Sequence, residues 1–254
     1  MEITFDQSAY DWWELIPAIV GGIIGAFAGG IPAWLLARRA SKETLLRDRL
    51  SREEAELAKV YSAHTKLGVM VNDLVTTVLL VRDMMTRPVD PRDESPTQRR
   101  VSAVAGKQLR PELLFSPDDL AIFIAANQPD YLSELDLFSR RYAADMNVLE
   151  TYGVLKAELH NLISDCPEIR FGRGDAVSTP STGPTANKLR MKARTLESVI
   201  VPLIEMMERD ARHGMELAKR FDTVLKGHFP NRKVPGFQFE RDIEAAFSAP
   251  PIGN

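Results

Sequence analysis

Cysteine is almost missing from this sequence: one residue of 254, Cys166, carries a thiol. A single cysteine excludes a disulfide bond within the chain and is typical of proteins in a reducing compartment. The sequence also lacks the Gly-x-Ser-x-Gly, His-Glu-x-x-His and Cys-x-x-Cys motifs that mark nucleophilic, zinc and thiol chemistry. We therefore expect no enzymatic activity, no cofactor and no resident metal ion.

Basic residues are missing from the beginning of the chain. No lysine or arginine precedes Arg38, whereas four acidic residues do, and the part from Arg38 onward carries basic and acidic residues in nearly equal number. Nucleic-acid-binding proteins usually have a clear basic excess. The charge pattern therefore excludes a dedicated nucleic-acid binder, and the partners we expect are proteins and membrane lipid.

Charge of either sign is missing from residues 15–37, a run of 23 residues. As a helix with a rise of about 1.5 Å per residue, this run would cross a hydrocarbon core of about 30 Å. Arg38, Arg39 and Lys42 follow it directly; positive charge stays on the cytoplasmic side, where it can also meet lipid headgroups. The sequence predicts a single-pass transmembrane helix over 15–37, a short external segment over 1–14 and a cytoplasmic remainder. In a bacterial cell this location would be the inner membrane.

Three other interpretations of this run deserve comparison with the membrane helix. Ala26-Phe27-Ala28 has the pattern of a signal-peptide cleavage site, but no positive charge precedes the run, which continues nine residues past that site. A phosphate-binding loop requires Gly-x-Gly-x-x-Gly between a strand and a helix, and the glycines here are spaced differently. A buried helix of a soluble protein is the third alternative. We prefer the membrane helix to all three.

The glycines of this run recur at helical spacing. Gly21, Gly25 and Gly29 are four residues apart, and Gly22 and Gly30 belong to an adjacent stripe on the same broad face. Helices in lipid associate where small residues let their backbones approach closely. We expect these glycines to pack against the same face of a second copy, which would make the protein a homo-oligomer.

A long helix is predicted to follow Arg39 and to end near Met85. Its apolar residues recur in steps of four and three from Leu46 to Met85, which is the heptad spacing of a coiled coil. From Val69 onward the apolar positions widen beyond one stripe, and this favours burial in a bundle. The residues on which we base this seam are Leu57, Leu67, Val71 and Leu74.

The rest of the chain indicates further helices and no convincing strand. Ser116 and Pro117 form a helix start signal, and Pro129 starts a helix that runs to about Ser164. The remaining expectations are loops near 86–96 and 165–186, a short helix over 98–108, a third long helix over 185–226 with Pro202 inside it, and a tail over 229–254 with a short helix over 240–247. The predicted fold is all-α: a transmembrane helix that continues into a cytoplasmic up-and-down bundle or coiled coil over 38–228.

Two of the four histidines lie at positions that bear on metal binding. His64 lies on the apolar seam, where a core or interface histidine is the preferred interpretation. Asp210, His213 and Glu216 follow one another in steps of three and could form half of a carboxylate-bridged metal site. A second such motif on a facing helix is missing from the sequence, so we prefer a solvated polar face.

Together these features predict a membrane-anchored helical scaffold or adaptor that self-associates and recruits cytosolic partners. The alternative is an oligomeric membrane-perturbing or channel-forming effector built from the glycine-rich helix. The run contains no polar or ionisable residue, and ion paths usually place such groups in the membrane. A sensor is a third hypothesis, for which we find neither an external domain nor an output module.

Overall fold

The computed structural model describes residues 12–86, 96–104, 108–165, 170–171, 177–178, 183–230 and 232–248. Within these ranges some side chains are not described, among them those at 12–15, 23–24 and 26–32. Cys166, nearly all of the predicted external segment and most of the predicted loop near 86–96 therefore lie outside the described residues.

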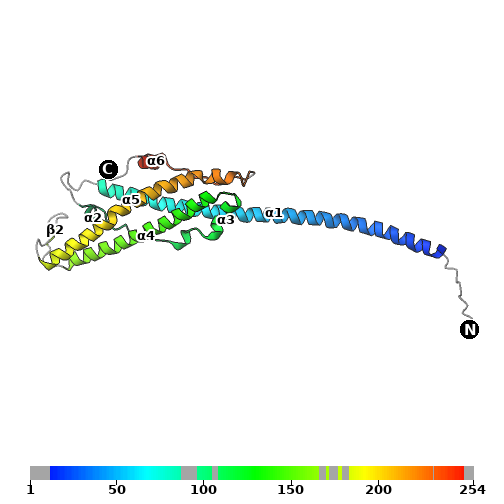
Figure 1. Cartoon of the computed structure of the whole chain (residues 1–254), viewed down its shortest axis with the longest axis horizontal. Coiled ribbons are helices and arrows are strands. Elements are labelled where there is room, and N and C mark those ends of the chain that lie inside the picture. Colours follow the sequence, from blue (N-terminus) through cyan, green and yellow to red (C-terminus); the bar gives the residue numbers. More distant parts are fainter. Residues whose placement is uncertain are drawn as a thin grey trace, which may run out of the picture. The chain divides into compact units, whose positions relative to one another are not determined.

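Most of the described residues are helical, and the strands among them form one short pair (Figure 1). The predicted all-α fold and helical bundle are thus confirmed. The helices are α1 (Trp12–Thr86), α2 (Thr97–Arg100), the 3-10 turn η1 (Pro111–Leu113), α3 (Pro117–Ala125), α4 (Pro129–Ser164), α5 (Pro184–Lys226) and α6 (Arg241–Ser248). Two strands of two residues each, β1 (Arg170–Phe171) and β2 (Val177–Ser178), pair antiparallel within the segment that we expected to be an irregular connector.

Helix α1 is 75 residues long and belongs to two compact units of the chain. The first unit comprises residues 1–57, and the second comprises residues 58–254. In the first unit every described side chain from 16 to 52 is exposed. In the second unit the same helix is buried along one side, beginning at Val60. We call residues 12–57 the N-terminal segment of α1, and residues 58–248 the bundle.

Three long helices build the bundle: residues 58–86 of α1, then α4 and α5. Helices α4 and α5 are antiparallel, because Tyr131 bonds to Leu217 near one end and Glu158 pairs with Lys192 near the other. Helix α1 is also antiparallel to α5, since His64 lies against Phe221 whereas Arg82 pairs with Glu208. Consequently α1 and α4 run in the same direction, and the expected up-and-down order applies only to α4 and α5.

The parallel arrangement of α1 and α4 requires a long connection between them. After α2 the chain returns along α1 in the opposite direction. Arg110 binds Asp73 of α1, and four residues later the Leu114 carbonyl accepts a hydrogen bond from Lys66, which lies earlier on α1. Helix α2 is shorter than predicted. It ends at Arg100, and the next residue, Val101, is buried, has an extended backbone and accepts a hydrogen bond from the Tyr152 hydroxyl through its carbonyl.

The helix starts follow the sequence signals. Ser116 caps α3 in a capping box, in which its hydroxyl accepts from the Asp119 amide and the Asp119 carboxylate accepts from the Ser116 amide. Proline occupies the first turn of α3, α4 and α5, where no intrahelical donor is needed. Gly183 precedes α5 with φ of 104°, a left-handed conformation that favours glycine.

The bundle core is rich in aromatic and branched side chains from all three long helices. The closest approach occurs at Gly214 of α5, where an added Cβ would lie 2.6 Å from the Phe138 ring of α4 and 2.9 Å from Val71 of α1. The glycine therefore permits the three helices to pack together at this level. The largest fully buried side chains include Tyr131, Tyr142, Tyr152, Phe123, Phe138, Phe221, Leu67 and Leu74.

Candidate functional site

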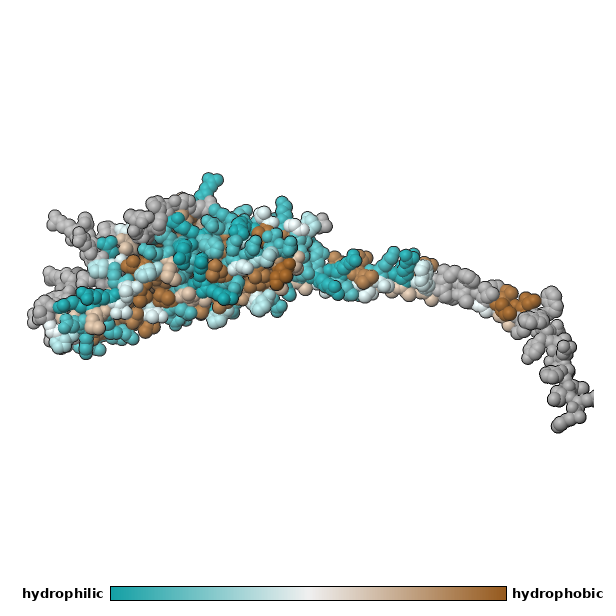
Figure 2. All heavy atoms as spheres, in the orientation of Figure 1, coloured by the Kyte–Doolittle hydropathy of each residue, from teal (hydrophilic) through white to brown (hydrophobic). Residues whose placement is uncertain are grey.

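Most of the exposed large apolar side chains among the described residues belong to the N-terminal segment of α1. Trp34 is 57% exposed and Leu36 65%, and the apolar residues farther along the helix remain similarly open, as Figure 2 shows along this part of the molecule. Single exposed apolar side chains are normal on a protein surface, but a series along one helix indicates a contact with something else. The exposed members are Ile16, Ile19, Val20, Trp34, Leu35, Leu36, Leu45, Leu46 and Leu50.

The glycines that we expected to pack between helices lie within this segment. An added Cβ at Gly21, Gly22 or Gly25 would meet no atom within 4 Å. Gly29 and Gly30 are also helical, but the surroundings of these two residues lie outside the described part. The three described glycines are thus open positions on a helix surface, and no described residue lies against them.

The basic residues that follow are exposed as well. Arg38, Arg39 and Lys42 all lie on the surface of α1. The guanidinium of Arg38 lies 5.2 Å from the centre of the Trp34 ring, in a cation–π contact between residues one helical turn apart. Indole and guanidinium groups together suit the boundary between apolar and polar surroundings.

In the part of α1 and of the other helices that the structure describes, no stretch is both long and apolar enough to cross a membrane. The predicted span over 15–37 includes positions whose side chains lie outside that part. The membrane helix therefore gains no support from the structure and stays a prediction.

The predicted seam divides at the boundary between the two units. Leu67, Val71 and Leu74 are buried inside the chain's own bundle, with exposures of 0%, 2% and 0%. Leu57 is half-buried, and upstream of it Leu46 and Leu50 are exposed. The heptad pattern thus serves packing within the chain from Val60 onward and leaves its earlier members available.

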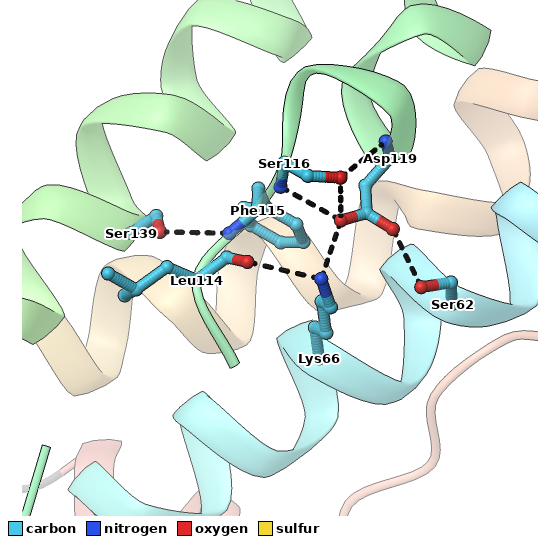
Figure 3. A network of polar contacts seen from close by, with 7 residues as sticks. All are labelled: Ser62, Lys66, Leu114, Phe115, Ser116, Asp119 and Ser139. Atoms are coloured by element: carbon cyan, nitrogen blue, oxygen red, sulfur yellow. Dashed lines mark hydrogen bonds and ion pairs between the residues drawn. The ribbon is translucent and has the colours of Figure 1, made fainter. Parts of the chain in front are cut away.

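Asp119 is the centre of a polar network that joins α1 to the start of α3 (Figure 3). Its carboxylate accepts hydrogen bonds from Ser62 and Lys66 of α1, both at 2.6 Å, and from the amide and hydroxyl of Ser116 at 2.8 and 2.7 Å. Burial alone would raise the pKa of this carboxyl group, but the hydrogen bonds from Lys66, Ser62 and Ser116 outweigh it and lower the pKa to about 2. The network therefore holds an ionised carboxylate in place.

Two further networks connect α1 to the other long helices. Asp73 of α1 accepts from the Tyr142 hydroxyl at 3.0 Å and from Arg110 at 2.8 Å. Arg82 pairs with the buried Glu208 of α5, which also accepts from Arg212 at 2.8 Å. Asp73 and Glu208 thus each have a charged partner, which offsets the cost of burying a carboxylate.

The residues that follow α5 pack on α1 and α5 through aromatic side chains. The Phe237 ring stacks on His64 with 3.9 Å between centres and meets Phe221 edge-on at 5.9 Å. Phe247 of α6 is buried, and its ring lies 5.3 Å from the Arg82 guanidinium. His64 is therefore a half-buried histidine between aromatic rings, and burial lowers its pKa although a hydrogen bond with the Gly236 backbone raises it.

The polar face predicted on α5 is only partly solvated, which corrects our preferred interpretation. Asp210 is fully buried against Arg141 of α4 and the neighbouring Arg209, whereas Glu216 is exposed and His213 is half-buried. Among the described residues, no three metal-ligating side chains gather into a group that could hold an ion. The sequence pattern missed this burial, since Asp210 and Glu208 read as ordinary surface acids until their arginine partners are known.

Asp145 of α4 is a further buried acid, and it lies close enough to Asp210 of α5 for the two charges to interact. It was not singled out by any motif, because an aspartate in the middle of an amphipathic helix usually points to water. Comparison of the chain with protein-family models, with curated proteins and with solved structures finds no match.

Proposed function

We propose that this protein is a membrane-anchored scaffold that self-associates through the N-terminal segment of α1 and presents the bundle to cytosolic partners. One observation carries the proposal: the bundle buries most of its large apolar side chains, whereas the described ones of the N-terminal segment up to Leu50 are all exposed. Exposed apolar surface of this extent is unfavourable in water by about 25 cal/mol per Å². A membrane and a second copy are the surroundings that this surface fits.

The order of residues along α1 supports different roles for successive parts of this helix. The uncharged run over 15–37 would lie in lipid, with Trp34 and Arg38 at its inner boundary and Arg39 and Lys42 next to lipid headgroups. Gly21, Gly22 and Gly25 are open, so that a second helix can approach their backbones closely. Beyond the lipid, Leu46 and Leu50 would continue the contact in the same heptad register.

The membrane anchor is tested first by fractionation of cells that express the full chain. The protein should sediment with membranes, resist extraction by high salt or alkaline carbonate, and dissolve in detergent. Recovery in the soluble fraction, or release by salt alone, would refute the anchor.

Self-association is tested on the detergent-solubilised full chain by measuring the mass of the complex. The wild type should be an oligomer, and Gly25→Ile should reduce it to a monomer, because the larger side chain keeps the helices apart. Val20→Phe is the matched control. Position 20 lies roughly 140° around the helix from position 25, so added bulk there should leave the oligomer intact.

Two results would overturn this assembly. A monomeric wild type would exclude the homo-oligomer, and a Gly25→Ile oligomer of unchanged mass would exclude glycine packing as its basis. Ion leakage from vesicles that contain the wild type, abolished by Gly25→Ile, would replace the scaffold by the channel-forming alternative.

A further inference from the structure

Asp145 of α4 is a buried carboxyl group that has no hydrogen-bond partner among the described residues. Its exposure is 0%, and neither Oδ1 nor Oδ2 has a donor within hydrogen-bond distance. Most buried acids of the bundle differ from it. Asp119, Asp73 and Glu208 each accept from a lysine, an arginine or a tyrosine. A charged carboxylate with no donor is strongly unfavourable in such surroundings, and groups of this kind become neutral instead.

The nearest charges make ionisation harder still. Asp210 of α5, itself fully buried, takes the Arg209 Nε at 3.2 Å and the Arg141 guanidinium at 3.5 Å. Burial and the negative charge of Asp210 raise the pKa of Asp145 from 3.8 to about 7, although Arg209 and Arg141 lower it. The charged residues Asp73 and Arg82 of α1 are bonded elsewhere, to Tyr142 and Glu208.

We propose that Asp145 is a proton-binding site within the contact between α4 and α5: the protonated, neutral form lets the two helices close, and loss of the proton loosens them. A metal ion fits this place less well than a proton does. Two guanidinium groups already neutralise Asp210, and the described residues offer no third acidic, histidine or cysteine ligand. This inference does not depend on the proposed scaffold function, because it concerns the bundle alone.

The sign of the pH effect follows from linkage. The native state holds the proton up to a higher pH than the unfolded chain does, so that raising the pH favours unfolding. The wild-type unfolding constant, relative to that of Asp145→Asn, should rise by nearly tenfold per pH unit from about pH 4 to about pH 7, and then level off. Effects of histidines and other carboxyl groups cancel in this ratio.

The experiment is urea unfolding of the full chain in detergent, followed by the near-UV circular dichroism of tyrosines, over about pH 5 to 8.5. The wild type, Asp145→Asn and Glu150→Gln are compared. Glu150 is an exposed carboxylate on the same helix, so its variant should follow the wild-type profile. In the wild type, infrared difference spectra should also show a protonated carboxyl band at pH 6 that disappears by pH 8.5 and is missing from Asp145→Asn.

Three outcomes would overturn the proposal. One is an identical pH profile for the wild type and Asp145→Asn. Another is failure of Asp145→Asn to fold, because the amide is the neutral equivalent of the proposed state. The third is stabilisation of the wild type, but not of Asp145→Asn, by Mg²⁺ or Ca²⁺ at pH 8.5, which would indicate a cation site in place of a proton site.

Discussion

Helix α1 carries leucines in one heptad register, and their surroundings differ completely between its two parts. Leu46 and Leu50, in the N-terminal segment, are 60% and 50% exposed. Leu67 and Leu74, in the bundle, are each 0% exposed. The residue type and the heptad register are the same, so local sequence does not account for the difference. It arises because α4 and α5 cover the second part of the helix.

The polar residues of α1 show the same contrast. In the bundle, Lys66, Asp73 and Arg82 each reach a charged or hydrogen-bonding partner on another element. In the N-terminal segment, Arg38 contacts Trp34 and Thr44 donates to the Ala40 carbonyl, both within the same helix. The bundle is therefore self-sufficient, in the sense that these polar side chains find their partners within it. The N-terminal segment, in contrast, exposes apolar residues of the kind that form contacts with other helices or with lipid.

The largest effect that tests this comparison is expected from matched leucine substitutions. Leu67→Ala removes a fully buried side chain and should lower the free energy of unfolding by about 2–5 kcal/mol. Leu46→Ala removes an exposed one and should change it by less than about 0.5 kcal/mol. Urea unfolding of the detergent-solubilised chain, followed by near-UV circular dichroism, measures both.

The aromatic residues allow the two parts to be followed separately in one sample. All three tryptophans, Trp12, Trp13 and Trp34, belong to the first unit, whereas the buried tyrosines Tyr131, Tyr142 and Tyr152 belong to the bundle. Leu67→Ala should shift the tyrosine transition and leave tryptophan fluorescence unchanged. A common shift of both signals would show that the two parts unfold together and would break the comparison.

Periodicity and proline positions predicted the long helices to within a few residues. Such signals are local: Ser116 caps α3 through Asp119, and the prolines stand at the helix starts. The common direction of α1 and α4 could not be predicted in this way. It depends on Arg110 and Leu114 returning along α1, and these contacts join residues far apart in the sequence.

The buried charges were beyond sequence reasoning for a related reason. Asp145 and Asp210 belong to helices with an ordinary amphipathic pattern, so the sequence does not distinguish them from solvent-exposed acids. They are buried because α4 packs on α5. Phe237 likewise lies in a segment without regular structure, where its position against His64 and Gly68 has no periodic signal. For the glycines of the N-terminal segment, in contrast, spacing remains the main argument.

The next largest change in the free energy of unfolding is expected from glycine substitutions, one at a closely packed position and one at an open position. Gly214→Ala would bring a Cβ to 2.6 Å from the Phe138 ring and 2.9 Å from Val71, so the helices must move apart. We expect a loss of about 3 kcal/mol in the free energy of unfolding. The control is Gly153→Ala in α4, where nothing lies within 4 Å of the new Cβ, and which should stabilise by about 0.5–1 kcal/mol because alanine favours helix.

These two substitutions should therefore differ in sign, and thermal unfolding of both variants beside the wild type decides the matter. Equal destabilisation would mean that Gly153 also has a close neighbour. A stable Gly214→Ala variant would show that α1, α4 and α5 are less tightly packed than this structure indicates, and it would weaken the description of the bundle as self-sufficient.

The smallest expected change in the free energy of unfolding concerns the beginning of the bundle part of α1, where Ser62 and Lys66 bind Asp119. These residues hold Asp119 ionised, with its pKa lowered to about 2 from 3.8. Because the folded-state pKa is the lower one, the carboxylate stabilises the bundle above pH 4 and loses this contribution as the pH falls toward 2. The contribution is about 2 kcal/mol, so Asp119→Asn should lose that amount at pH 7.

The acid unfolding profile provides the measurement and the matched control. Asp118→Asn alters the adjacent carboxylate, whose side chain is 91% exposed and lies 3.8 Å from Lys59, and should behave as the wild type does. Below pH 4 the tyrosine signal of Asp119→Asn should depend less on pH than that of the wild type, because the variant has no charge to lose there. If the acid profile of Asp119→Asn equals that of the wild type, the Asp119 network does not stabilise the attachment of α1 to the start of α3. The beginning of the bundle would then have to be sought at Asp73, the next residue of α1 with a buried charge and partners on two other segments.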